Sequence, residues 1–89
     1  MTTEQWFVYI VRCSDKSLYT GIATDVGRRL DEHNNNTSLG AKYTRARRPV
    51  ELVYQETVSS RSAAASREHA IKSLSKPEKE ILIRTYSGT

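Results

Sequence analysis

Three charged or titratable side chains occupy positions where the sequence pattern predicts apolar residues: Arg29, His33 and Glu68. Arg29 and His33 share a helical stripe of residues 24–35 with apolar side chains, and Glu68 does the same in residues 63–74. Hydrolysis of a phosphodiester needs a group that activates the nucleophile, a cation for the developing charge and an acidic metal ligand. These residue types supply candidates for each need. We therefore expect either that Arg29 pairs with Glu68 or that both face a ligand.

A purely structural interpretation of the same residues stays open. Buried charges are usually paired, so an ion pair between Arg29 and Glu68 would suit an interaction subunit with no catalytic role. A metal site that joins His33 to Cys13 or His69 has weak support, because no pair of these residues has a recognised short ligand spacing.

Two tyrosines lie on neighbouring strands of a predicted β-hairpin. Residues 6–12 and 18–22 are rich in aromatic and β-branched side chains, and a polar turn separates them. Side chains alternate across a strand, which puts Tyr9 on one face of the first strand and Tyr19 with Gly21 on one face of the second. We expect the two tyrosines to lie side by side, either as an ordinary cross-strand pair or as part of a site.

The other elements follow from caps, turns and periodicity. Residues 24–35 form a helix capped by Thr24 or Asp25, and the asparagines at 34–36 favour a turn. A third strand is predicted over 50–55 and a helix over 63–74, with caps offered by serines among residues 59–62; Ser75 opens a capping box for a last helix. The predicted order is β-β-α-loop-β-α-α, an α/β (α+β) arrangement without internal repeats.

Composition limits the class of protein. The 89 residues suffice for one domain, with its core over about 6–84, and no stretch approaches a membrane span. The first residues have neither a basic region nor an apolar signal core, which predicts a cytoplasmic location. Cys13 is the only cysteine, so no intramolecular disulfide can form.

The positive charge gathers in one segment. Fourteen Lys and Arg against ten Asp and Glu give a net charge of +4. Residues 40–49 contain no acidic residue, and an interleaved aromatic and four cations make them typical of a phosphate-contacting loop, although a solvated surface loop has the same composition. The candidate nucleic-acid-binding residues are Lys42, Tyr43, Arg45, Arg47 and Arg48.

Taken in order along the chain, these residues resemble the GIY-YIG endonuclease superfamily. Tyr9 stands at the tyrosine of the GIY element, and Tyr19-Thr20-Gly21 stands for YIG ten residues later. Arg29 and His33 match the arginine of the family's first helix and the histidine or tyrosine one turn on, and Glu68 matches the metal-binding glutamate. Residues 40–54 resemble the small single-domain YhbQ-like branch.

The resemblance implies a fold and a set of roles. The fold would be a three-stranded antiparallel sheet flanked by helices, and the activity hydrolysis of phosphodiesters with one Mg²⁺ or Mn²⁺ ion per site. Glu68 would hold the metal and Arg29 would clamp the non-bridging phosphate oxygens, since its planar guanidinium offers paired donors. Tyr9, Tyr19 or His33 would accept a proton from the attacking water. The choice among these three stays open at this point.

The sequence departs from the family pattern in two places. The first element reads Phe7-Val8-Tyr9 without glycine or isoleucine, and the last helix offers lysines and glutamates where many members have an asparagine. No attached DNA-binding domain is present in these 89 residues, so substrate choice would come from the core, from residues 40–48, or from a protein partner or second copy.

Three functions remain to be compared. The favoured one is a metal-dependent endonuclease in DNA repair or recombination, acting on DNA rather than RNA and away from membranes. The alternatives are a non-catalytic nucleic-acid-binding module that keeps the fold, and an interaction subunit.

Overall fold

The computed structural model describes residues 5–36 and 38–86, and the elements follow the predicted order. They are β1 (Trp6–Arg12), β2 (Leu18–Ala23), α1 (Val26–Asn35), α2 (Lys42–Arg45), β3 (Glu51–Val58), α3 (Arg61–Lys72) and α4 (Lys76–Arg84). The short helix α2 lies inside the segment that was predicted as a loop. Within the described residues, no helix has both the length and the apolar character needed to cross a membrane.

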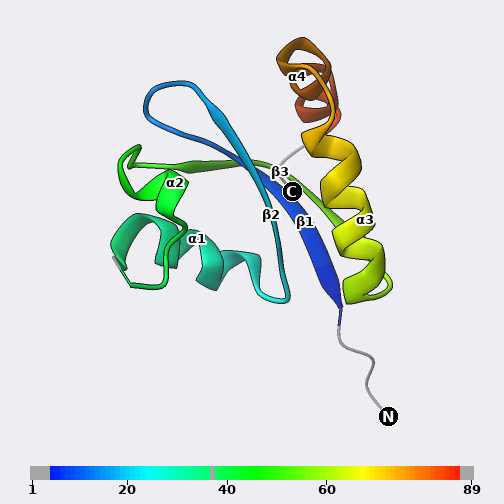
Figure 1. The fold of residues 1–89 in the computed structure, drawn as a ribbon, viewed down its shortest axis with the longest axis horizontal. Helices are drawn as coiled ribbons and strands as arrows, with labels where there is room; N and C mark the ends of the chain where they lie inside the picture. The colour runs from blue at the N-terminus through cyan, green and yellow to red at the C-terminus, as the bar shows by residue number, and fades with distance from the viewer. Residues whose placement is uncertain (1–4, 37, 87–89) are drawn as a thin grey trace.

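The three strands form one antiparallel sheet in the order β2-β1-β3 (Figure 1). In the β1–β2 hairpin Tyr9 pairs with Gly21 and Val11 pairs with Tyr19. This register puts Tyr9 and Tyr19 on the same face, one pair apart, as the alternation of the two strands predicts. Because β1 is central, its middle residues are buried from both sides, whereas β2 is an edge strand.

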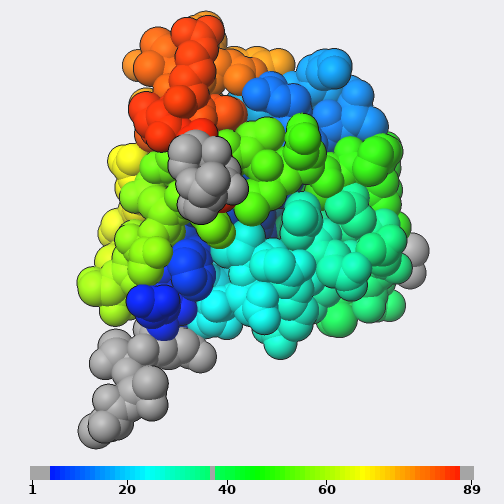
Figure 2. All heavy atoms as spheres, turned by 180° about the vertical axis from the view of Figure 1, so that it is seen from behind, coloured from blue at the N-terminus to red at the C-terminus, as the bar shows by residue number. Residues whose placement is uncertain are grey.

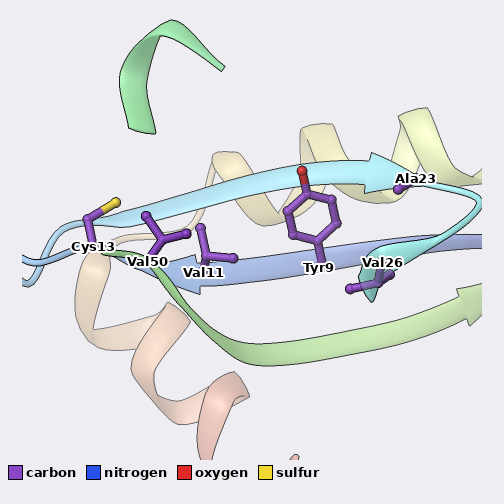
Figure 3. Close-up of a cluster of buried hydrophobic side chains, with 6 residues drawn as sticks. All are labelled: Tyr9, Val11, Cys13, Ala23, Val26 and Val50. Carbon is purple, nitrogen blue, oxygen red and sulfur yellow. The ribbon is translucent and has the colours of Figure 1, made fainter. Parts of the chain in front are cut away.

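Helices cover both faces of the sheet, with α1 and α2 on one side and α3 and α4 on the other (Figure 1). Each side has its own core. The α1 side buries Tyr9, Val11, Cys13, Ala23, Val26 and Val50, which Figure 3 shows along one face of the strands. The α3 side buries Val8, Ile10, Tyr54, Ala64 and Ile71, and side chains of α4 pack against them.

Side-chain caps fix where the helices begin. Asp25 accepts a hydrogen bond from the backbone N–H of Arg28 at the start of α1, and Ser60 does the same for Ala63 at α3. Ser75 forms the predicted capping box, in which its side chain and that of Glu78 satisfy each other's backbone N–H groups. The helices therefore begin at residues whose side chains satisfy otherwise unpaired amides.

The last helix lies beside the tip of the β1–β2 hairpin (Figure 2). Arg12 donates two hydrogen bonds to the Glu80 carboxylate, at 2.7 and 2.8 Å, and Lys76 donates to the backbone carbonyl of Lys16. The bidentate geometry suits a guanidinium and a carboxylate, and it ties α4 to the end of the central strand.

Candidate active site

Tyr9 and His33 meet in the core between the sheet and α1. Tyr9 is 2% exposed and His33 is fully buried, and the Tyr9 hydroxyl lies 2.8 Å from Nε2 of His33. Tyr9 comes from the central strand, and His33 comes from the last turn of α1, on the stripe that the periodicity predicts to face the sheet. The two residues that the sequence separates by 24 positions thus form one polar contact inside an apolar core.

Gly21 makes room for the Tyr9 hydroxyl. The ring rises from β1 toward β2 (Figure 3), and a Cβ atom on Gly21 would lie 2.5 Å from the Tyr9 hydroxyl oxygen. The last residue of the Tyr19-Thr20-Gly21 element therefore has a steric reason to be glycine. Any larger residue would push the tyrosine out of its place.

Replacing Gly21 by alanine should lower the free energy of unfolding by about 1–3 kcal/mol, the usual cost of overpacking a core. Gly27→Ala is the matched control, because a Cβ atom there meets nothing closer than 3.7 Å and alanine favours a helix. Urea denaturation of both variants measures the difference. A Gly21→Ala variant as stable as Gly27→Ala would show that the tyrosine can shift freely.

Arg29 lies at the edge of this core. It is half-buried, and its Nη1 pairs with the Glu32 carboxylate at 3.0 Å and donates to the backbone carbonyl of Leu39. Glu68 pairs instead with Lys72 at 3.3 Å. Among the described residues Arg29 and Glu68 form no ion pair with each other, so the structural pairing considered from the sequence is not formed. Each keeps a partner on its own helix.

Burial and neighbouring charges shift the pKa of the Tyr9 hydroxyl, and Arg29 and Glu68 affect it in opposite directions. Burial raises the pKa of Tyr9 to about 12, with a further rise from neighbouring Tyr19. The positive charge of Arg29 lowers this pKa, and the negative charge of Glu68 raises it. Arg29 comes from α1 and Glu68 from α3, and these two helices cover opposite faces of the sheet.

The same burial keeps His33 neutral. Its pKa falls to about 4, first because burial disfavours the imidazolium and second because Arg29 is nearby. His33 Nδ1 lies 3.0 Å from the Thr44 hydroxyl, and the backbone N–H of Ala41 donates to the same nitrogen at 3.3 Å. Both ring nitrogens are therefore engaged inside the protein.

Tyr19 continues this cluster toward the surface. Its ring lies edge-on to His33, with centroids 5.5 Å apart, and stacks on Tyr43 at 5.8 Å. The Arg47 guanidinium lies 4.0 Å from the centre of the Tyr43 ring and also pairs with Asp15. A line of rings and one cation thus leads from the buried histidine to α2.

The five residues predicted to bind nucleic acid have different surroundings. Arg48 donates to the carbonyls of His33 and Asn36, so its guanidinium caps the end of α1. Arg47 is engaged by Asp15 and Tyr43. Lys42 and Arg45 are exposed on α2, and within the described part of the chain neither takes part in an ion pair. Tyr43 is 38% exposed.

The carboxylate of Glu68 is the site's candidate metal ligand. The described residues contain no group of three His, Cys, Asp or Glu side chains that could enclose an ion. Mg²⁺ is commonly held by one or two carboxylates, with waters and substrate phosphates completing its shell. The Glu68 side chain is 24% exposed, so it is partly reachable from solvent and fits that kind of open site.

Three residues that make contacts in or around the site are not identified by the sequence patterns: Thr44, Asn34 and Glu32. Thr44 is fully buried against His33, and Asn34 exchanges two hydrogen bonds with the backbone of Val50, which joins α1 to the start of β3. These contacts join distant segments, so no local spacing reveals them. Glu32 could have been found, because its spacing of three residues from Arg29 is that of a helical ion pair.

Comparison with known proteins shows the family to which this chain belongs. Residues 5–81 match the GIY-YIG catalytic domain. The UPF0213 protein of Desulfotalea psychrophila is 57% identical over 79 residues, which cover 89% of this chain and 71% of that protein. The UPF0213 protein of Staphylococcus epidermidis is 53% identical over 81 residues, which cover 91% of this chain and 96% of the relative.

Solved structures agree with the fold. The solution NMR structure of a UPF0213 protein from Bacillus halodurans has a TM-score of 0.59 at 42% identity and covers 94% of this chain and 87% of its own. An NMR structure of an E. faecalis protein has the same TM-score at 40% identity and covers 91% of this chain and 85% of its own. The predicted superfamily and fold are confirmed, and this chain belongs to the GIY-YIG catalytic domain family, among small single-domain relatives.

Proposed function

We propose that this protein is a divalent-metal-dependent endonuclease that hydrolyses phosphodiester bonds of DNA, in repair or recombination and in the cytoplasm. The observation that carries the proposal is the buried contact between the Tyr9 hydroxyl and His33, with Arg29 one turn before His33 on the same helix. The positive charge of Arg29 lowers the pKa of the Tyr9 hydroxyl, and Glu68 lies on the helix that covers the other face of the sheet. Membership of a nuclease family adds support.

Arg29 would hold the phosphate that is attacked. Its guanidinium stays charged at any physiological pH and offers several donors in one plane, which suits two oxygens of a phosphate. The hydrogen bonds that Arg29 donates to Glu32 and to the Leu39 carbonyl both come from Nη1, so the N–H groups on its Nε and Nη2 would be available to a substrate. Glu68 would hold a Mg²⁺ or Mn²⁺ ion, which supplies charge stabilisation at the leaving oxygen when bound.

The proton acceptor would be one of the residues at the end of the Tyr9 side chain. His33 is fully buried, and both of its ring nitrogens are already engaged, by Tyr9 on one side and by Thr44 and Ala41 on the other. The Tyr9 ring rises from the central strand toward the edge strand β2, and Arg29 would favour a phenolate on Tyr9 through its charge. We assign the role to Tyr9, because the charge of Arg29 lowers its pKa, and assign Tyr19 to supporting it.

DNA would approach over α2. Lys42 and Arg45 offer two exposed cations for backbone phosphates, and Tyr43 offers part of an aromatic ring beside Arg47. Arg48 would contribute indirectly, because it fixes the end of α1 that carries His33. Such a small surface supports the further expectation that a partner or a second copy supplies specificity.

A non-catalytic nucleic-acid-binding module is the second candidate, and the pKa values of Tyr9 and His33 favour it. The pKa of Tyr9 is about 12 and that of His33 about 4, so in the free protein neither group is matched to proton transfer near neutral pH. A binding module needs only the exposed cations of α2, and its DNA affinity would fall with salt whether or not Glu68 is present.

The test is cleavage of labelled duplex, single-stranded, branched and RNA substrates in Mg²⁺ and Mn²⁺, with and without a chelator. Arg29→Ala and Glu68→Ala should each lower the rate by at least about 10²-fold, which is the usual cost of losing one group that stabilises transition-state charge. Binding without turnover, measured by fluorescence anisotropy at several salt concentrations, would support the second candidate.

Matched controls separate lost chemistry from lost folding or contamination. Arg28→Ala removes the neighbouring arginine, which is exposed, and Glu51→Ala removes an exposed carboxylate on β3. Both should cleave like the wild type when prepared in the same way. Cleavage at the wild-type rate in Arg29→Ala or Glu68→Ala preparations would point to a contaminating nuclease, and the endonuclease proposal would then fail.

A further inference from the structure

Helix α2 and the residue before it contact the buried side of His33, which no role proposed above explains. Thr44 is fully buried, although it lies among exposed cations in the sequence, and its hydroxyl oxygen is 3.0 Å from His33 Nδ1. The backbone N–H of Ala41 donates to the same nitrogen at 3.3 Å. A short helix with a polar outer surface thus places two hydrogen-bonding groups against one ring nitrogen.

The Ala41 amide decides which nitrogen of His33 carries the proton. A backbone N–H can only donate, so Nδ1 must offer a lone pair to it. A neutral imidazole has one proton, which then lies on Nε2, and Nε2 faces the Tyr9 hydroxyl at 2.8 Å. The opposite tautomer would point an N–H at an N–H and leave a buried amide unsatisfied.

The Thr44 hydroxyl can also donate a hydrogen bond to Nδ1, which further favours the tautomer with the proton on Nε2. Its oxygen lies 3.0 Å from the Ala41 carbonyl as well, but that carbonyl already accepts the backbone N–H of Arg45 at 3.1 Å. The hydroxyl can therefore turn its proton toward Nδ1 without leaving the carbonyl unpaired. The amide and the hydroxyl then share the single lone pair of Nδ1, and one donor, Nε2–H, is directed at Tyr9.

We infer that the Ala41 amide and the Thr44 hydroxyl hold His33 as a hydrogen-bond donor to Tyr9, which makes Thr44 a positioning residue. His33 is then not the proton acceptor of the site. Its Nε2–H stabilises a phenolate on Tyr9 and leaves the hydroxyl's own proton directed away from the histidine. The tautomer stands independently of catalysis, whereas its effect on cleavage rests on the proposed function.

The tautomer can be read from long-range ¹H–¹⁵N correlation spectra of histidine-labelled protein at pH 7. The wild type should show His33 with a protonated Nε2 and a pyridine-like Nδ1. Thr44→Val keeps the branched shape and removes one donor, so the Nδ1 signal should move further downfield, and Thr44→Ser should restore it. Thr57→Val makes the same change at an exposed position of β3 and should leave the His33 signals unchanged.

Cleavage adds a second readout. Loss of Thr44's hydroxyl should lower kcat about 10-fold, at the lower end of the range for groups that orient a histidine ligand, and serine should recover it. A wild-type spectrum with the proton on Nδ1, or a Thr44→Val spectrum identical to the wild type, would overturn the inference. Absence of cleavage in the wild type would instead overturn the proposed function, and the spectra would still decide the tautomer.

Discussion

Tyr9→Phe should lower the rate of DNA cleavage by about 10²–10⁴-fold, the range that a positioned proton acceptor contributes. The substitution removes one oxygen and keeps the ring that fills the core, so the apolar contacts of Tyr9 remain. Arg29 and the Nε2–H of His33 would then have no phenolate to stabilise. Single-turnover kinetics at saturating enzyme measure this loss apart from substrate binding.

The same substitution at two other tyrosines tests whether the loss of cleavage is specific to Tyr9. Tyr19→Phe should cost less, because Tyr19 lies beside Tyr9 and contacts His33 through its ring, which phenylalanine keeps. Tyr86→Phe is the matched control on the α3 side of the sheet, where Tyr86 packs against Tyr54. If Tyr19→Phe proved the more damaging change, the proton acceptor would be Tyr19 and the assignment to Tyr9 would be wrong.

The stability of Tyr9→Phe carries separate information. Removing the hydroxyl leaves the His33 Nε2–H without its partner in the core, which should cost about 1–3 kcal/mol of unfolding free energy. A large loss of cleavage with a modest loss of stability would therefore be catalytic in origin. The two quantities need to be measured on the same preparation.

Much of the fold was predictable because local signals and the final packing agree. The alternation of side chains that predicts the hairpin and the capping box at Ser75 are both signals carried by residues close together in the sequence. The end of a strand differs from the prediction where pairing with a segment distant in the sequence decides it. Strand β3 was predicted to end at residue 55 but continues to Val58, because Trp6 of β1 pairs with it there.

The candidate site was only partly predictable. Residue types and order grouped Tyr9, Arg29, His33 and Glu68, and their joint role stays a prediction; the structure places Tyr9 against His33, whereas Glu68 pairs with Lys72 on α3. Their hydrogen-bond partners depend on tertiary packing. Arg29 reaches the Leu39 carbonyl, and Arg48 reaches carbonyls at the end of α1. A count of positive charges in residues 40–48 cannot distinguish an arginine that caps a helix from one that meets phosphate.

Acidification should destabilise the protein through His33. Its pKa is about 4 in the folded protein and 6.5 ordinarily, so between these values the unfolded chain binds more protons than the folded one. Stability is therefore lost as the pH falls from 6.5 to 4. At 1.36 kcal/mol for each pKa unit, the contribution of His33 is about 3 kcal/mol across that interval. Urea denaturation at a series of pH values measures it.

A pair of substitutions isolates this contribution from that of the carboxylates, which titrate in the lower part of the same interval. His33→Gln keeps a polar side chain and removes the titration, so the unfolding free energy should depend less steeply on pH between 6.5 and 4. His69→Gln makes the same change on an exposed face of α3 and should leave the wild-type slope. Equal slopes in all three proteins would mean that His33 accepts a proton in the folded state, and that the core opens to water more readily than its packing implies.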